Sequence, residues 1–83
     1  MSSRSGLTPM FRQYRALKEQ RPDSILLFRM GDFYEMFYDD AKTASGLLDL
    51  TLTARGKGTD HVVPMCGFPF HQLEQYTAAI AAL

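Results

Sequence analysis

The sequence predicts a mixed α/β fold in which helices flank a short β-sheet. Eighty-three residues can form at most one small domain. The hydrophobic fraction of 46% supplies enough apolar side chains for one core and is too high for a disordered chain. Along the chain the patterns follow the order helix, strand, strand, helix, strand, strand, helix, which is typical of a layered α/β domain.

The first helix is predicted to begin at Thr8-Pro9, after a polar segment, residues 1–7, that we expect to be flexible. Threonine suits the N-cap of a helix, and proline suits its first position. The apolar residues behind them recur at helical spacing and should face the core: Met10, Tyr14 and Leu17. Arg21-Pro22-Asp23 should end this helix.

Two strands joined by a tight turn are expected next. Ser24–Phe28 contains a dense apolar run bounded by turn residues, which is typical of a buried strand. Met30-Gly31-Asp32 suits a tight turn or bulge, because glycine adopts positive φ without steric cost. Phe33–Phe37 is then predicted to be the second strand.

Alternation along this second strand allows two interpretations. On an extended chain one face holds Phe33, Glu35 and Phe37, and the other holds Tyr34 and Met36. If the latter pair points into the core, Phe33 and Glu35 project together, as an aromatic wedge beside a hydrogen-bonding carboxyl group. Alternatively, Phe33 and Phe37 are core residues and Glu35 lies at a solvated edge. Periodicity by itself favours the second interpretation, because most aromatic side chains in small domains are buried.

A short helix should follow the second strand. Asp39 and Asp40 suit its first turn, where carboxylates interact favourably with the helix dipole. The helix is expected to run through Ala44 and to end at Gly46, since glycine is the commonest residue just past a helix end.

Two further strands and a last helix complete the prediction. Leu50–Thr53 alternates as a half-buried strand, and the polar loop Ala54–His61 follows it. Val62-Val63 begins another extended segment, which Pro64 should confine to a sheet edge or a bulge. Gly67-Phe68-Pro69 is interpreted as a turn into the last helix. The stripe of that helix consists of Phe70, Leu73, Tyr76, Thr77, Ile80 and Leu83. The stripe has no stop signal, so we expect the chain to be cut there, at the C-terminal end of an incomplete domain.

Composition and charge narrow the possible functions. No segment resembles a signal peptide or is long enough to span a bilayer, so a soluble, cytoplasmic protein is expected. The single cysteine, Cys66, excludes an internal disulfide. A net charge of zero argues against strong sequence-independent binding to nucleic acid. Residues 1–22 nevertheless hold five basic groups against one acid, whereas residues 23–50 hold two against six, so any DNA contact should be local.

Other polar clusters are weaker candidates for chemistry. A metal site could use the acids Asp32, Glu35, Asp39 and Asp40, or His61, Cys66 and His71, but neither set has a recognised ligand spacing. A hydrolase triad could use Asp32 and His71 with Ser24 or Ser45, but no nucleophile-elbow sequence supports it. We therefore expect neither a metal nor a catalytic residue.

The loop Arg55–Thr59 resembles the tail of a phosphate-binding loop. It lacks the upstream glycine and the following helix that such a loop requires, so we interpret it as flexible. Arg55 and Lys57 could still contact DNA phosphates.

Several stretches of the sequence resemble the start of the mismatch-recognition domain of the MutS family. They are Thr8-Pro9-Met10, Gln13-Tyr14, residues 26–35, Phe37, Asp40-Ala41, Leu52-Thr53 and residues 64–71. Within them, Gly31-Asp32-Phe33-Tyr34-Glu35 is the most specific signal. Cys66 stands where the family often has alanine, a conservative difference. The similarity covers nearly the whole chain from Thr8 onward.

The resemblance implies a domain over residues 8–83, a mixed sheet surrounded by helices that lacks its last strands. It implies binding to double-stranded DNA with mismatches or unpaired bases through a Phe-x-Glu motif, here Phe33 and Glu35. Further contacts are expected on the basis of the resemblance at Met65, Gly67 and Pro69.

The resemblance also implies a larger parent protein. That protein would be a homodimeric clamp in the bacterial cytoplasm, associated with the nucleoid, with a distant ABC-type ATPase domain that uses ATP and magnesium. It would bind a MutL-type partner, while this chain would hold no catalytic residue and no cofactor. A hypothesis of another class stays open: a protein-interaction module whose exposed apolar patch consists of Phe33, Phe37 and Phe68.

Overall fold

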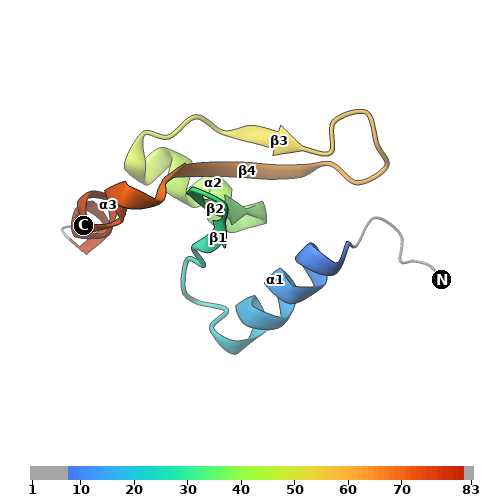
Figure 1. Cartoon of the computed structure of the whole chain (residues 1–83), viewed down its shortest axis with the longest axis horizontal. Helices are drawn as coiled ribbons and strands as arrows, with labels where there is room; N and C mark the ends of the chain where they lie inside the picture. The colour runs from blue at the N-terminus through green and yellow to red at the C-terminus, as the bar shows by residue number, and fades with distance from the viewer. Residues whose placement is uncertain (1–7, 82–83) are drawn as a thin grey trace.

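The computed structural model describes residues 8–81, a four-stranded sheet with helices against both of its faces (Figure 1). The helices are α1 (Pro9–Gln20), α2 (Tyr38–Leu48), the 3₁₀ turn η1 (Phe70–Gln72) and α3 (Leu73–Ala81). The strands are β1 (Phe28–Met30), β2 (Phe33–Phe37), β3 (Thr53–Arg55) and β4 (Val63–Pro69), in the sheet order β1-β2-β4-β3. All three strand pairings among the described residues are antiparallel. The predicted class and the predicted order of elements are confirmed.

Some predictions lie outside the described residues. These are the flexible segment, residues 1–7, and the end of the last apolar stripe, Leu83, together with the side chain of Ile80. Within the described part of the chain, no helix is long and apolar enough to cross a membrane.

Helix α1 begins as its sequence predicts, and two of its three predicted core residues face the core. The Thr8 hydroxyl oxygen accepts a hydrogen bond from the Phe11 N–H at 3.3 Å, which caps the helix. Tyr14 is buried together with Phe11, and Met10 is partly buried against the same cluster, so the predicted stripe is wrong only at Leu17, which is exposed. The next side chain on the buried face, Lys18, forms an ion pair with Asp40 of α2.

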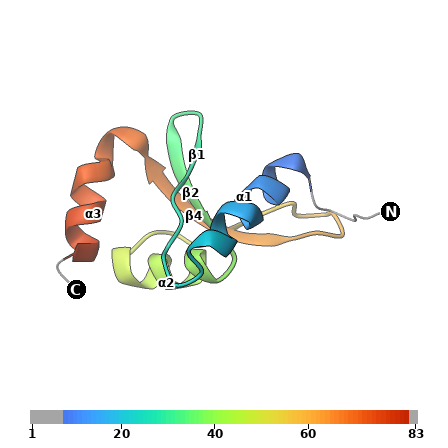
Figure 2. The same ribbon diagram turned by 90° about the horizontal axis from the view of Figure 1, so that it is seen from below.

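The two faces of the sheet bury separate clusters. On one face Met36, Cys66 and Phe68 pack against α2, and two residues of α3 add to this cluster, Leu73 and Tyr76. On the other face Phe37 and Val63 pack against two residues of α1, Phe11 and Tyr14. Figure 2 shows α1 and α3 on opposite sides of the β1–β2 hairpin.

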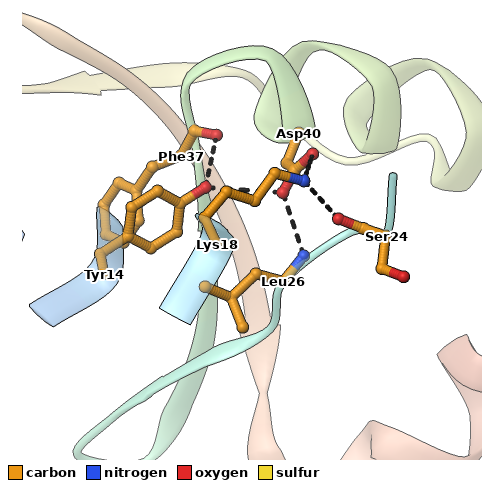
Figure 3. A network of polar contacts seen from close by, with 6 residues as sticks. All are labelled: Tyr14, Lys18, Ser24, Leu26, Phe37 and Asp40. Carbon is orange, nitrogen blue, oxygen red and sulfur yellow. Dashed lines mark hydrogen bonds and ion pairs between the residues drawn. The ribbon is translucent and has the colours of Figure 1, made fainter. Parts of the chain in front are cut away.

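A buried carboxylate holds α1 in place (Figure 3). The Asp40 carboxylate accepts hydrogen bonds from Lys18 Nζ at 2.9 Å and from the Leu26 N–H at 3.0 Å. The Tyr14 hydroxyl donates to the same carboxylate at 3.5 Å and to the Phe37 carbonyl oxygen at 3.2 Å. Burial, and next the Asp40 charge, raises the pKa of Tyr14, so the hydroxyl keeps its proton. These bonds join α1 to the end of β2 and to α2, and they join α2 to the segment before β1.

The predicted strand Ser24–Phe28 is wrong except at its last residue. Only Phe28 belongs to β1, which continues to Met30. The segment before it is irregular because the Leu26 N–H is bonded to the Asp40 carboxylate, not to a neighbouring strand.

Helix α2 also extends beyond its prediction. It runs through Gly46 and ends at Leu48, and Asp49 takes the left-handed conformation at φ 57°. The Leu50 N–H then donates to the Ser45 carbonyl oxygen at 3.1 Å. A left-handed aspartate here fills the capping role that the sequence assigned to Gly46.

The last two strands are shifted from their predicted positions. The predicted strand Leu50–Thr53 is wrong before Thr53, where β3 begins. The predicted turn Gly67-Phe68-Pro69 is part of β4, which lies inside the sheet. Both prolines of β4 are tolerated because each has a strand on one side only: Pro64 pairs with β3 beyond the end of β2, and Pro69 pairs with β2 beyond the end of β3.

Candidate nucleic-acid interface

The register of β2 against β4 brings the predicted DNA-binding residues of both strands to one face of the sheet. Cross-strand partners in an antiparallel sheet point to the same side. The partners are Phe33 with Pro69, Glu35 with Gly67, and Phe37 with Met65. The five predicted residues that lie in these two strands thus share one face, although 28 or more positions separate the partners in each pair.

This face has a covered end and an open end. At the covered end Phe37 is fully buried beneath α1, with its ring centroid 5.1 Å from that of Phe11 and 5.3 Å from that of Tyr14. At the open end the Phe33 side chain is 43% exposed. The projection of Phe33 from the sheet is therefore confirmed, and the alternative that it is a core residue is wrong.

The inward-facing residues of β2 behave as predicted. Met36 is fully buried, and Tyr34 packs against the same cluster, on the side of α2 and α3. Phe33, which is exposed, and Glu35, which is half-buried, therefore point away from this cluster.

Glu35 lies across Gly67. A Cβ atom added at position 67 would lie 2.6 Å from the Tyr34 carbonyl oxygen and would overlap the Glu35 carboxyl group. Only glycine permits this close approach, so Gly67 leaves open the space that the Glu35 carboxyl group occupies. Burial of the half-exposed side chain raises the pKa of Glu35, and the positive charge of Arg55 opposes that shift. The site favours the neutral acid more than water does.

The two predicted phosphate contacts are exposed, as expected. Arg55 ends β3 opposite Val63, and so lies on the same face as Phe37 and Glu35. Lys57 lies in the loop that joins β3 to β4. The end of this loop contacts α2, because the His61 Nε2 lies 3.1 Å from the hydroxyl group of Tyr38, the first residue of that helix.

Met65 lies apart from the open end. It is half-buried in the cluster beneath α1, opposite Phe37. The exposed patch proposed for a protein-interaction module is wrong, since Phe37 and Phe68 are both buried and on opposite faces of the sheet.

The two candidate sets of metal ligands do not converge within the described residues. No group of three or more His, Cys, Asp or Glu side chains among residues 8–81 could hold a metal ion. The Asp40 carboxylate is occupied by its three donors, and the buried Cys66 thiol donates to the Ala41 carbonyl oxygen at 3.4 Å.

Sequence reasoning missed a contact behind the open end. The Arg29 guanidinium carbon lies 4.2 Å from the centroid of the Phe70 ring, which is 40% exposed. The sequence assigned Phe70 to the stripe of the last helix, but it belongs to η1 instead. No local pattern signals the pairing, because it depends on the register of three strands.

Nearly the whole chain is similar to one known protein family. The family model described as MutS domain I matches residues 8–82. The matched range contains all four strands and every predicted contact residue.

Proposed function

Because the chain belongs to the MutS domain I family and acts in mismatch recognition and DNA binding in DNA mismatch repair, we propose that Phe33 enters the duplex at a mispair. In this proposal Glu35 hydrogen-bonds the mispaired base. The observation that carries the proposal is the 43% exposure of Phe33 on a face whose other phenylalanine in β2, Phe37, is fully buried. An exposed aromatic ring beside a half-buried carboxyl group can stack and hydrogen-bond at one position.

Discrimination then comes mainly from the deformability of DNA. Inserting a wedge unstacks a base step and kinks the duplex, at a cost of a few kcal/mol. A mispair has already lost part of its pairing, so the same kink costs less there. Stacking Phe33 on the base returns about 1–3 kcal/mol. Such a mechanism can recognise many different mispairs, because binding depends more on the stiffness of the duplex than on the identity of the bases.

The carboxyl group of Glu35 adds a second criterion. A negative charge beside a polyanion is unfavourable unless the group accepts a base N–H or is itself protonated. Burial raises the pKa of Glu35, which supports a neutral acid that donates to a purine N7. A carboxyl group capable of both roles tolerates different bases.

Arg55 and Lys57 are proposed to contact phosphates, since both are exposed and Arg55 shares the face of Glu35. Replacing either with alanine should weaken matched and mismatched binding about equally. Each replacement should lower the slope of log affinity against log salt by about 0.9. Selective loss of mismatch binding would mean that these residues read the mispair.

The proposal extends to a larger protein. We propose a homodimeric clamp in the bacterial cytoplasm, near the nucleoid, that hydrolyses ATP with magnesium in a separate ABC-type domain and binds a MutL-type partner. In this arrangement the present chain binds DNA and catalyses nothing. The resemblance of the sequence to the family supports this extension.

Two variants of the full-length protein test the site, each titrated with matched and mispaired duplexes at two salt concentrations. Phe33→Ala should lower mismatch affinity to the level of matched duplex. Glu35→Gln should raise affinity for matched duplex at least as much as for mispaired duplex, because repulsion from the phosphates is removed. Glu74→Gln, at an exposed position of α3, is the matched control for loss of one charge. Loss of binding to both duplexes by Glu35→Gln would show that the charge attracts a base.

A further inference from the structure

Arg29 ties together the parts of the chain around the β1–β2 turn. Its Nε donates a hydrogen bond to the Gly31 carbonyl oxygen at 2.6 Å. Its guanidinium carbon lies 4.2 Å from the Phe70 ring centroid and 5.8 Å from the Tyr34 ring centroid. One side chain therefore contacts the turn, β2 and η1.

A backbone hydrogen bond supports the same connection. The Phe70 N–H donates to the Asp32 carbonyl oxygen at 2.7 Å, and so links η1 directly to the turn. Gly31 takes φ 57°, as a two-residue hairpin loop with glycine at its first position requires. The Arg29 contacts and the hydrogen bond between Phe70 and Asp32 both hold the turn against η1, the segment that follows β4.

The turn needs such support because the sheet supplies little of it. β1 has only three residues and lies at the sheet edge. β4 ends at Pro69, which is the partner of Phe33, so the turn projects beyond the last strand pairing (Figure 2). Two strands alone form a marginally stable hairpin in water.

We propose that Arg29 and Phe70 are positioning residues for Phe33. The contact between Arg29 and Phe70 holds the β1–β2 hairpin against η1. The hairpin therefore keeps its position when Phe33 inserts into a base step. This inference rests on the proposed function, and it assigns to the two residues the stiffness of the wedge, not contact with the mispaired base.

The register separates Arg29 from the base-contacting face. Arg29 pairs with Tyr34, and Phe33 pairs with Met30, so Arg29 and Phe33 point to opposite sides of the sheet. Phe33 shares its side with Pro69. Arg29 thus acts from behind the sheet, and the face that meets the base stays unobstructed.

Three variants of the full-length protein test the inference. Phe70→Leu removes the ring, Arg29→Lys keeps the charge but removes the planar group and its Nε, and Phe70→Tyr keeps the stack. Affinity is measured for matched and mispaired duplexes, and the kink is measured by energy transfer between dyes at the duplex ends. Phe70→Leu and Arg29→Lys should each lower the mismatch preference about 3- to 10-fold, the size of a partly exposed cation–π contact. Matched binding should change less than about twofold, the kink should decrease, and Phe70→Tyr should behave as the wild type.

A double-mutant cycle separates positioning from general damage. Because both single changes remove the same Arg29–Phe70 contact, Arg29→Lys combined with Phe70→Leu should lose less mismatch preference than the sum of the two single losses. Thermal midpoints are measured alongside, and Phe70→Met replaces Phe70→Leu if the leucine variant does not fold. Unchanged preference in both single variants, additive losses, or equal loss for matched and mispaired duplex would overturn the inference.

Phe33→Ala in the same experiment distinguishes this inference from the proposed function. If Phe33→Ala loses mismatch preference while Phe70→Leu and Arg29→Lys retain it, only the positioning role is wrong. If Phe33→Ala retains the preference, the wedge itself is wrong and the positioning role falls with it.

Discussion

Phe37 and Phe33 are the same residue type on the same face of the same strand, yet one is fully buried and the other is 43% exposed. The difference lies in what covers each end of the face. Helix α1 lies over Phe37, and it is held there by Lys18 and the buried Asp40 carboxylate. Within residues 8–81, Phe33 has no such cover. The covered end provides stability, whereas the open end is available to a ligand.

The largest expected effect separates the two phenylalanines. Phe37→Ala should lower the free energy of unfolding by about 3–5 kcal/mol, because it leaves a cavity among α1 side chains. Phe33→Ala should change it by less than about 1 kcal/mol, because the side chain is partly in water already. Urea unfolding of both variants measures the difference. Equal destabilisation would mean that Phe33 is also a structural residue and that the two ends do not differ in role.

A second prediction concerns the attachment of α1. Lys18→Met keeps the apolar stem but leaves the Asp40 carboxylate without its cation, and should cost about 1–3 kcal/mol of stability. Lys42→Met, at an exposed position of α2, is the matched control. The mismatch preference of the folded Lys18 variant should be unchanged, since the open end does not depend on this ion pair. Altered preference at full folding would show that the two ends are coupled.

Alanine substitutions at two glycines should change the stability of the protein in opposite directions. Gly67→Ala should cost about 1–3 kcal/mol, since the added methyl group meets the Tyr34 carbonyl oxygen and displaces Glu35. Gly46→Ala has no atom within 4 Å of the new Cβ and lies within α2. It should gain about 0.4–1 kcal/mol. Thermal melts of both variants decide the matter, and a neutral Gly67→Ala would mean that glycine is not required beneath Glu35.

The order of elements could be predicted from the sequence because each element carries a local signal, such as Thr8-Pro9 before α1. The exposure of Phe33 could not, because it depends on how far α1 extends over the sheet. The errors have the same origin. Ser24–Phe28 is predicted to be a strand, but only Phe28 belongs to one, because the Leu26 N–H is bonded to the side chain of Asp40, which is distant in sequence. Pro64 is predicted to confine its segment to a sheet edge or a bulge, but the unequal lengths of β2 and β3 allow it within β4.

The candidate site was predictable in its residue types but not in its arrangement. Residues two apart in a strand lie on the same face, so the Phe-x-Glu pattern predicts that Phe33 and Glu35 share a face. The resemblance to the family adds the expectation that this pair is a DNA-binding motif. The pairing of Glu35 with Gly67 and the stack of Arg29 on Phe70 both depend on strand register. Register is a tertiary property that no local window of the sequence contains.

The smallest expected effect is a pH dependence at the open end. Burial raises the pKa of Glu35 in the folded state, so the unfolded chain ionises first as the pH rises. The free energy of unfolding is therefore highest below the ordinary glutamate pKa. It falls as the pH passes between the unfolded and folded values, and stays lower above them.

Glu35→Gln removes this loss, so the variant should gain stability relative to wild type as the pH rises through that window. Urea midpoints of both proteins from about pH 4 to neutral measure the gain. Glu74→Gln on α3 is the control. A constant difference between Glu35→Gln and wild type at every pH would contradict burial of the carboxyl group.

Photocrosslinking of the mispaired base tests the role of the open end most directly. A duplex with 5-iodouracil in the mispair is bound to the full-length protein and irradiated, and the modified peptide is identified by mass spectrometry. The crosslink should form at Phe33, and it should be absent when the same 5-iodouracil is correctly paired. A crosslink at Phe70 or His71, or one of equal yield with the matched duplex, would contradict the assignment of Phe33 as the wedge.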